Sequence, residues 1–189
     1  AQRAQAEAAV AAARASLSYT EIRAPFAGTV QARRVGAGDL VANAQHIPVH
    51  LGSMPLAVEE VMRDFPGTLR EGDQVILNDP YRGGTHLPDI TLLRPVFHRG
   101  SLLGFAVNRA HHADVGGIAP GSMPASATRL EEEGVILEPQ KFLDRGRERA
   151  EVVTHIRRGM REPAERLGDL RAQVAANELA ARRLEELAQ

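Results

Sequence analysis

The segment from residue 78 to residue 117 constrains the fold of this chain most, because two apolar runs in it flank a short turn. The runs cover residues 90–97 and 102–110, and the residues between them read His-Arg-Gly-Ser. A short glycine-containing connection between two strand-length apolar runs is typical of a β-hairpin. We therefore expect an antiparallel hairpin, with Pro95 indicating that its first strand lies at a sheet edge.

Side chains of the kind that bind metal ions lie at both outer ends of this predicted hairpin. They are His86, Asp89, His111, His112 and Asp114. If residues 99–100 form the loop, Asp89 faces Ala110 and His111 faces Pro88 across the hairpin. Directly opposed residues on paired strands lie about 5 Å apart. The two groups therefore meet at the open end of the hairpin, where a single ion can contact both strands.

The register leaves open which of the two adjacent histidines faces Asp89. Strict alternation places His112 on that side of the hairpin, whereas one bulged residue places His111 there instead. Histidine with carboxylate suits Zn, Mn or Fe, and the chain has no cysteine to supply a thiolate ligand. The alternative is that these residues are ordinary polar groups of the surface. Glycines beside both groups, which let the backbone approach a ligand closely, favour the metal site.

Composition narrows the classes of partner. The formal net charge of −1 argues against a nucleic-acid-binding protein. The sequence has no apolar run approaching the roughly 20 residues that a membrane-spanning helix needs. The chain begins at Ala1 and ends at Gln189, each within a helix-like pattern, so we expect it to be a fragment of a longer protein.

The first 41 residues have a character of their own. Residues 1–17 are rich in alanine and favour a helix, while residues 18–41 alternate strand-like stretches with glycine-containing turns. This region resembles the lipoyl-like half-motif of bacterial periplasmic adaptor (membrane fusion) proteins. The matching residues are Leu17, Thr20, Ile22, Ala24, Pro25, Phe26, Gly28 and Val30. The resemblance implies a first domain over residues 1–41 and, as an alternative function, a non-enzymatic adaptor subunit of an efflux or secretion system.

From about residue 40 onward, the chain resembles the hydantoinase B/oxoprolinase family instead. This family includes subunits of ATP-dependent hydantoinases, the C-terminal part of 5-oxoprolinases, and subunits of acetone and acetophenone carboxylases. The matching motifs include Asn78-Asp79-Pro80-Tyr81, Gly83-Gly84-Thr85-His86-Leu87-Pro88-Asp89, Arg109-Ala110-His111-His112-Ala113-Asp114 and Gly168-Asp169-Leu170. The resemblance implies a second domain over residues 42–189, and from the change of character near residues 36–46 we expect a chimeric or misassembled reading frame, or an engineered junction.

The family resemblance implies metal ligation by His86, Asp89 and His111, with His112 and Asp114 as candidates for catalysis. The candidates for substrate binding are Arg109, Asp79 and His50. The alternatives are that Arg109 pairs with a nearby aspartate and that Asp79 braces its turn. The implied cofactor is a divalent metal, either Zn, Mn or Fe. The implied substrate is a cyclic amide or an activated ketone.

The same resemblance implies a partner, a separate ATP-binding subunit of the hydantoinase A type, and hence a hetero-oligomer. The chain contains no Gly-x-x-x-x-Gly-Lys-Ser/Thr phosphate loop, so we expect ATP to act only through that partner. We expect a cytoplasmic location, or a periplasmic one if residues 1–41 direct it, and no membrane contact for residues 42–189.

Local patterns predict the remaining elements. Residues 55–64 have the spacing of a short amphipathic helix, and residues 73–77 and 135–137 have the character of short strands. Asp169 is placed to cap the start of a final helix that packs through an apolar stripe. The predicted fold class is α+β, with a mixed, largely antiparallel sheet, a metal-site hairpin and helices at both termini.

Overall fold

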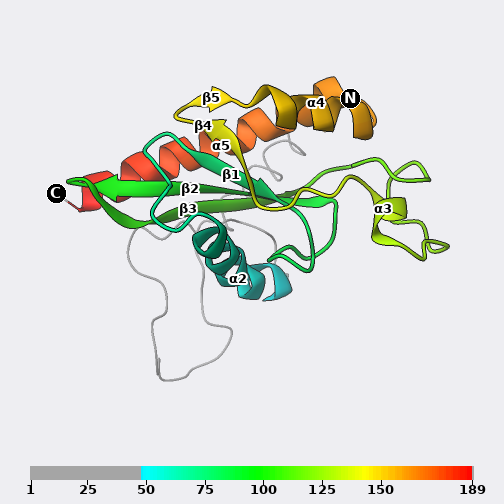
Figure 1. Ribbon diagram of the computed structural model, residues 1–189, viewed down its shortest axis with the longest axis horizontal. Coiled ribbons are helices and arrows are strands. Elements are labelled where there is room, and N and C mark those ends of the chain that lie inside the picture. The colour runs from blue at the N-terminus through cyan, green and yellow to red at the C-terminus, as the bar shows by residue number, and fades with distance from the viewer. Residues whose placement is uncertain (1–47, 189) are drawn as a thin grey trace, which may run out of the picture. The chain divides into compact units, whose positions relative to one another are not determined.

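A computed structural model describes residues 48–188, in which an antiparallel five-stranded sheet packs between helices (Figure 1). The elements follow one another as α2 (Pro48–Asp64), β1 (Gln74–Leu77), β2 (Asp89–His98), β3 (Ser101–His111), α3 (Leu130–Glu133), β4 (Gln140–Asp144), β5 (Arg147–Glu148), α4 (Ala150–Gly159) and α5 (Pro163–Leu187). The strand order is β3-β2-β1-β4-β5, and each neighbouring pair is antiparallel. The α+β prediction is confirmed, but this sheet is wholly antiparallel rather than mixed.

The predicted hairpin is confirmed as β2 and β3. Arg99 and Gly100 form its two-residue loop, both with positive φ, as a tight turn between twisted strands requires. His98 pairs with Ser101 as expected, but the register then shifts between Val96 and Phe97. One bulged residue on β3 therefore changes every pairing beyond this point. Its consequence at the far end is that Asp89 pairs with His111 instead of Ala110.

The prediction that the first hairpin strand lies at a sheet edge is wrong. β2 lies between β3 and β1, and β3 is the edge strand. Pro95 is tolerated because β1 is short: it pairs with β2 only from Thr91 to Leu93. Beyond Leu93, β2 forms no backbone hydrogen bonds with β1, so the N–H group that proline lacks is not needed on that side.

The two faces of the sheet carry different helices, as Figure 1 shows for α2 and α5. Val75, Leu77 and Leu93 pack against Ala57 and Val61 of α2. On the opposite face, α4 and α5 cover a larger apolar cluster that includes Ile76, Ile90, Leu92, Phe142, Ile156 and Leu170. Successive residues of a strand point to opposite faces, so the fully buried β1 contributes to both cores.

Two helix boundaries differ from the sequence prediction because proline occupies first-turn positions. α2 begins at Pro48 rather than near residue 55 and continues through Pro55, so His50 lies in its first turn. α5 begins at Pro163, and Asp169 therefore lies inside the helix instead of capping it. A proline in the first turn loses no intrahelical hydrogen bond, because the N–H groups there have no partner.

Residues 135–137 form no strand, contrary to the prediction. The buried side chain of Asn78 makes hydrogen bonds to this segment of the kind that a neighbouring strand would make. Its Nδ2 donates to the carbonyl oxygen of Val135 at 2.9 Å, and its Oδ1 accepts from the N–H of Leu137 at 2.7 Å. One amide side chain therefore fastens this segment to the end of β1.

Three predictions fall on residues outside the described range. They are the helix over residues 1–17, the half-motif over residues 18–41 and the chimeric junction near residues 36–46. Within residues 48–188, the structure has no helix both long and apolar enough to cross a membrane.

Candidate functional site

Three histidines surround one buried carboxylate at the open end of the hairpin. Asp89 is the first residue of β2 and is completely inaccessible to solvent. His50 Nε2 and His86 Nε2 lie 2.9 and 3.1 Å from its Oδ2 atom, and His111 Nδ1 lies 3.1 Å from its Oδ1 atom. The structure thus brings together His86, Asp89 and His111, as expected from the sequence, and adds His50.

The separations among these atoms fit a metal ion. One potential ligand atom from each of His50, His86 and Asp89 lies within 4.8 Å of the others. Two ligand atoms, each about 2.1 Å from an ion, lie about 3.0 Å apart at the right angles of an octahedral site and about 3.4 Å apart at the tetrahedral angle usual for zinc. The observed histidine–carboxylate separations match the octahedral value. Imidazole nitrogens with a carboxylate oxygen suit Zn, Mn or Fe better than Mg or Ca.

Each ligand-bearing segment is folded into place by a local feature. The N-terminal turn of α2 carries His50, and the β3 bulge sets His111 opposite Asp89. The loop that carries His86 depends on two glycines. A Cβ on Gly83 would lie 2.6 Å from the Ala57 backbone, and a Cβ on Gly84 would lie 2.3 Å from the carbonyl oxygen of Asn78. Only glycine permits this close approach.

Arg109 connects the same segments through hydrogen bonds. Its Nε donates to Thr91 Oγ1 at 2.7 Å, its Nη1 donates to Ser53 Oγ, and its Nη2 donates to the carbonyl oxygen of Gly83 at 3.2 Å. These partners belong to β2, α2 and the loop before β2. Ser53 Oγ in turn donates to the carbonyl oxygen of His50 at 3.1 Å. The guanidinium therefore connects the backbone segments that supply the candidate ligands.

Burial governs the electrostatics of the cluster. It lowers the pKa of His86, an effect that the nearby Asp89 carboxylate only partly offsets. The neutral imidazole that results is the form able to bind a metal. Burial also lowers the pKa of Arg109, again partly offset by Asp89. Thr85 Oγ1 donates to Asp89 Oδ2 at 2.7 Å, so a neutral hydroxyl also orients the carboxylate.

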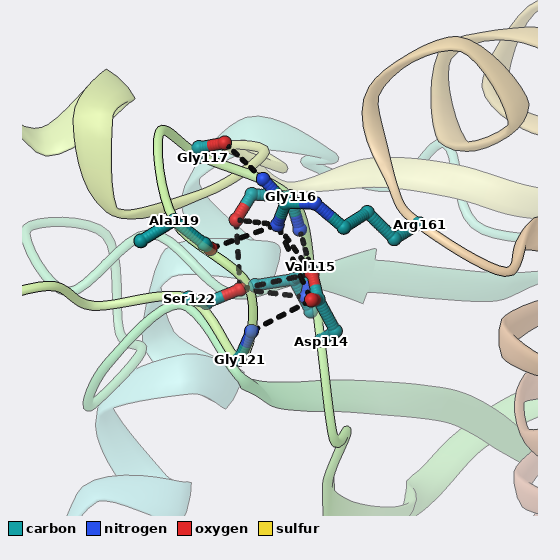
Figure 2. A network of polar contacts seen from close by, with 8 residues as sticks. All are labelled: Asp114, Val115, Gly116, Gly117, Ala119, Gly121, Ser122 and Arg161. Atoms are coloured by element: carbon teal, nitrogen blue, oxygen red, sulfur yellow. Dashed lines mark hydrogen bonds and ion pairs between the residues drawn. The ribbon is translucent and has the colours of Figure 1, made fainter.

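Asp79 and Asp114 lie away from this cluster and brace loops. Asp79 Oδ1 accepts from the N–H of Tyr81 at 2.9 Å, within the turn that follows β1. Asp114 accepts from the N–H groups of Gly116 and Gly121 and from Arg161 Nη1 (Figure 2). The catalytic role expected for Asp114 and the substrate contact expected for Asp79 remain predictions.

Arg161 organises the loop after β3. Its guanidinium donates to the carbonyl oxygens of Gly116, Gly117 and Ala119 as well as to Asp114 (Figure 2). Gly116 and Gly117 have positive φ, and a Cβ on either would lie under 3.0 Å from backbone oxygen atoms. One arginine therefore holds a glycine-rich turn that ordinary residues cannot form.

His112 faces the opposite side of the sheet from Asp89. Its side chain is buried beneath α5, where its Nε2 lies 3.0 Å from Gln173 Oε1. The sequence prediction of an apolar stripe on α5 missed this region, because Arg166, Gln173 and Asn177 are buried there. The available signal was spacing: residues 170, 173 and 177 recur at helical intervals, yet two of them carry amides.

Comparison with known proteins places this architecture in one family. The family model described as "Hydantoinase B/oxoprolinase" matches residues 29–189. The chain therefore belongs to the hydantoinase B/oxoprolinase family. The match extends into the segment that resembles periplasmic adaptors, and the comparisons give the adaptor resemblance no support.

Two relatives, one of them with a crystal structure, show the extent of the similarity. The 5-oxoprolinase of Dictyostelium discoideum is 41% identical over 150 residues, covering 79% of this chain and 12% of that protein. The caprolactamase subunit beta of Pseudomonas jessenii is 34% identical over 149 residues, covering 79% and 26%. The crystal structure of this ATP-dependent caprolactamase matches with a TM-score of 0.72 and 35% identity, covering 76% of this chain and 25% of that chain.

A nucleotide-free acetone carboxylase shares the fold, with a TM-score of 0.68 and 24% identity over 74% of this chain and 19% of that chain. The chain thus spans about a quarter or less of the length of these relatives. Two of them, the caprolactamase and the acetone carboxylase, are named as ATP-dependent, and the caprolactamase has subunits.

Proposed function

We propose that this chain is part of the metal-binding subunit of an ATP-dependent enzyme that acts on a cyclic amide or an activated ketone. The divalent cation, Zn, Mn or Fe, is held by Asp89 together with His50, His86 and His111. His50, expected from the sequence to bind substrate, is thereby reassigned as a ligand.

The observation that carries the proposal is the convergence of imidazole nitrogens on a fully buried carboxylate, 2.9 to 3.1 Å away. Asp89 is not an ordinary surface residue, because it is completely buried and a buried carboxylate needs its charge to be compensated. A bound cation compensates the carboxylate charge and uses the neutral imidazoles as ligands.

A cation held here would act as a Lewis acid that polarises a carbonyl or phosphoryl oxygen. The chain's own residues hold and orient it. Asp89 supplies the charge, Thr85 fixes the direction of the carboxylate through its hydroxyl, and Arg109 keeps the ligand segments in register. The His111 side chain is 63% exposed, so the cluster opens to solvent on that side.

Metal analysis tests the site directly. The metal-stripped 189-residue chain, dialysed against micromolar Mn²⁺, Zn²⁺ or Fe²⁺, is expected to take up about one equivalent of the preferred ion. His86→Ala should lose the ion and stay folded by circular dichroism, because His86 is partly exposed and lies outside the apolar clusters. His155→Ala, at an exposed histidine on α4, is the matched control. Folded wild-type chain that binds none of the three ions contradicts the proposal.

The proposed partner is a separate ATP-binding subunit, forming a cytoplasmic hetero-oligomer with this protein. Support comes from the multi-subunit caprolactamase and from the absence of a phosphate loop in this sequence. The isolated chain is expected to be inactive with ATP on hydantoins, 5-oxoproline or ketones. Turnover by the purified chain alone, insensitive to His86→Ala, would overturn this division of labour.

A further inference from the structure

A groove of about 710 Å³ lies beside the β4–β5 turn, where β5 forms one edge of the sheet (Figure 1). Its walls come from the loop between α2 and β1, from β4 and from β5, and they carry four basic side chains and one carboxylate. The lining residues are Thr68, Arg70, Lys141, Asp144, Arg145 and Arg147. This excess of positive charge in a hollow surface attracts a negatively charged ligand.

The buried carboxylate of Asp73 holds the two walls of the groove together. Its Oδ2 accepts from the N–H of Arg70 at 2.8 Å, and its Oδ1 accepts from the N–H of Arg145 at 2.9 Å. The N–H of Gly146 donates to the carbonyl oxygen of Gly72 at 2.8 Å, and a Cβ on Gly72 would lie 3.1 Å from the backbone of that turn. The backbone that carries the arginines is therefore fixed before a ligand binds, so binding does not have to order it.

The charge of Lys141 is compensated within the groove, whereas the charges of the arginines are not. Lys141 Nζ lies 2.8 Å from Asp73 Oδ2 and 3.7 Å from Asp144 Oδ1. Burial raises the pKa of Asp73, but hydrogen bonds from Lys141 and from backbone N–H groups outweigh it and hold the pKa below its usual value. With residues 48–188, the three arginines of the groove form no ion pair, and Arg70 Nη1 donates to two backbone carbonyl oxygens at 2.8 Å instead.

The character of the lining narrows the class of anion. It has no aromatic or large aliphatic side chain against which a nucleotide base or a lipid chain could pack. Its three arginines are all exposed and are distributed over both walls. A guanidinium pairs most strongly with one carboxylate at a time, through two parallel hydrogen bonds. Several carboxylates spaced along a chain therefore match the groove better than one compact ion does.

We propose that this groove docks an extended acidic segment of a partner protein, whose aspartate or glutamate carboxylates pair with Arg70, Arg145 and Arg147. Asp144 repels such a segment and thereby limits which acidic sequences bind. Because salt screens exposed ion pairs, the contact is weak and reversible at physiological ionic strength. The groove adjoins the start of β1, whereas the cation cluster follows its end, and the docking site uses neither the cation nor ATP.

Fluorescence anisotropy of labelled hexaglutamate, titrated with the full chain, measures this binding. Hexaglutamine, which has the same length and no charge, should not bind. Arg145→Asn is the decisive variant, because Asn-Gly suits a two-residue turn and should preserve the fold. It should weaken hexaglutamate binding about two- to fivefold, the range for one exposed ion pair. Adding Arg147→Gln should increase the loss to about 4- to 25-fold.

The β2–β3 turn offers a matched control, because it has the same Arg-Gly sequence with positive φ at both residues. Arg99→Asn removes the same charge from the same turn position and should leave the affinity for hexaglutamate unchanged. Asp144→Asn removes the repelling carboxylate and should tighten binding by about two- to fivefold. Binding should also weaken as the salt concentration rises from about 20 mM to about 150 mM.

Three results would overturn the proposal. The first is no binding of hexaglutamate to the folded wild-type chain at low salt. The second is an equal loss of affinity in Arg145→Asn and Arg99→Asn, which would mean that net charge and not the groove attracts the peptide. The third is tighter binding of inorganic pyrophosphate than of hexaglutamate, since the groove would then hold a small anion. None of these measurements depends on the cation site.

Discussion

The two faces of the β2–β3 hairpin use polar side chains in opposite ways. On the α2 face, three imidazoles approach one carboxylate, and their nitrogens converge on a small volume. On the α5 face, Gln74, Asn108, Gln173 and Asn177 pass hydrogen bonds from one amide to the next beneath the helix. The first arrangement concentrates lone pairs around one point, and the second distributes donors and acceptors in alternation.

The difference shows that buried polar side chains can serve either to bind a ligand or to stabilise the fold. Alternating amides satisfy one another, so such a network stabilises a unique packing without a ligand. Converging imidazole nitrogens and carboxylate oxygens can instead coordinate a cation, which compensates the buried charge of Asp89. We therefore expect mutations on the α2 face to change cation binding and those on the α5 face to change stability.

The largest effect is expected from the buried carboxylate. Asp89→Asn removes the charge at the centre of the cluster and should abolish stoichiometric cation binding. The loss of cation affinity should exceed about 100-fold, because losses of about 10- to 100-fold are typical for residues that only hydrogen-bond to the metal ligands. Isothermal titration of the metal-free chain measures it, with Asp144→Asn at an exposed position of β4 as control. Unchanged cation affinity in Asp89→Asn would contradict the proposal that the α2 face of the hairpin, unlike the α5 face, binds a cation.

The amide network should govern stability. Asn177→Leu leaves Asn108 Nδ2 and the carbonyl oxygen of Leu92 each without one of its partners, at a cost of about 3 kcal/mol in the free energy of unfolding. Urea denaturation measures this cost. Leu179→Ala, at an exposed position on the same helix, should cost about 0.5 kcal/mol or less. Cation affinity of the folded Asn177→Leu chain should equal that of wild type. If Asn177→Leu lowered cation affinity without lowering the free energy of unfolding, the amide network would belong to the cation site and not to the scaffold.

Arg109 should affect the α2 face as a positioning residue. Arg109→Met keeps the aliphatic stem but releases α2, β2 and the Gly83 loop from one another. Cation affinity should fall by about 10- to 100-fold, the range for residues that orient metal ligands. Arg94→Met, on the same strand pair as the cluster but with only a 3.9 Å contact to Glu178, serves as the matched control. An equal loss in both variants would mean that charge alone, rather than positioning, is responsible.

The smallest effect concerns the loop beyond the hairpin and depends on pH. Burial raises the pKa of Asp114, but the N–H groups of Gly121 and Gly116 and the Arg161 guanidinium outweigh it and hold the pKa below its usual value. A depressed carboxyl pKa stabilises the fold above the unfolded-state value of about 3.9, and this contribution is lost as the pH falls through the folded-state pKa. Asp114→Asn should therefore cost about 1–2 kcal/mol at pH 7 and less at pH 3.

Urea midpoints at the two pH values measure this difference. Asp144→Asn, at a largely exposed carboxylate, should leave the midpoint nearly unchanged at both. A cost for Asp114→Asn that is the same at pH 7 and pH 3 would show that the ionised carboxylate contributes nothing through Arg161.

Much of the cluster was predictable because it depends on local signals. The turn residues and the apolar runs predicted the hairpin, and its register brought residues 86–89 beside residues 110–113. The identity of the facing histidine was not predictable. It depends on a bulge between Val96 and Phe97, and the one signal there, Gly104 opposite Val96, indicates a possible bulge without fixing the register beyond it. The participation of His50 depended on a helix that begins at Pro48, seven residues earlier than Pro55, where the apolar pattern predicted it.

The sequence by itself determined the family, the antiparallel hairpin and the residue types that gather at its open end, because motifs and turns are properties of neighbouring residues. Only the tertiary structure decided which residues face one another across 57 or more positions. Asn108 with Gln173, and Asn78 with Val135, are set by the packing of α5 and of an extended segment against the sheet. Such pairings minimise unsatisfied buried polar groups over the whole fold, a condition that no local window of sequence contains.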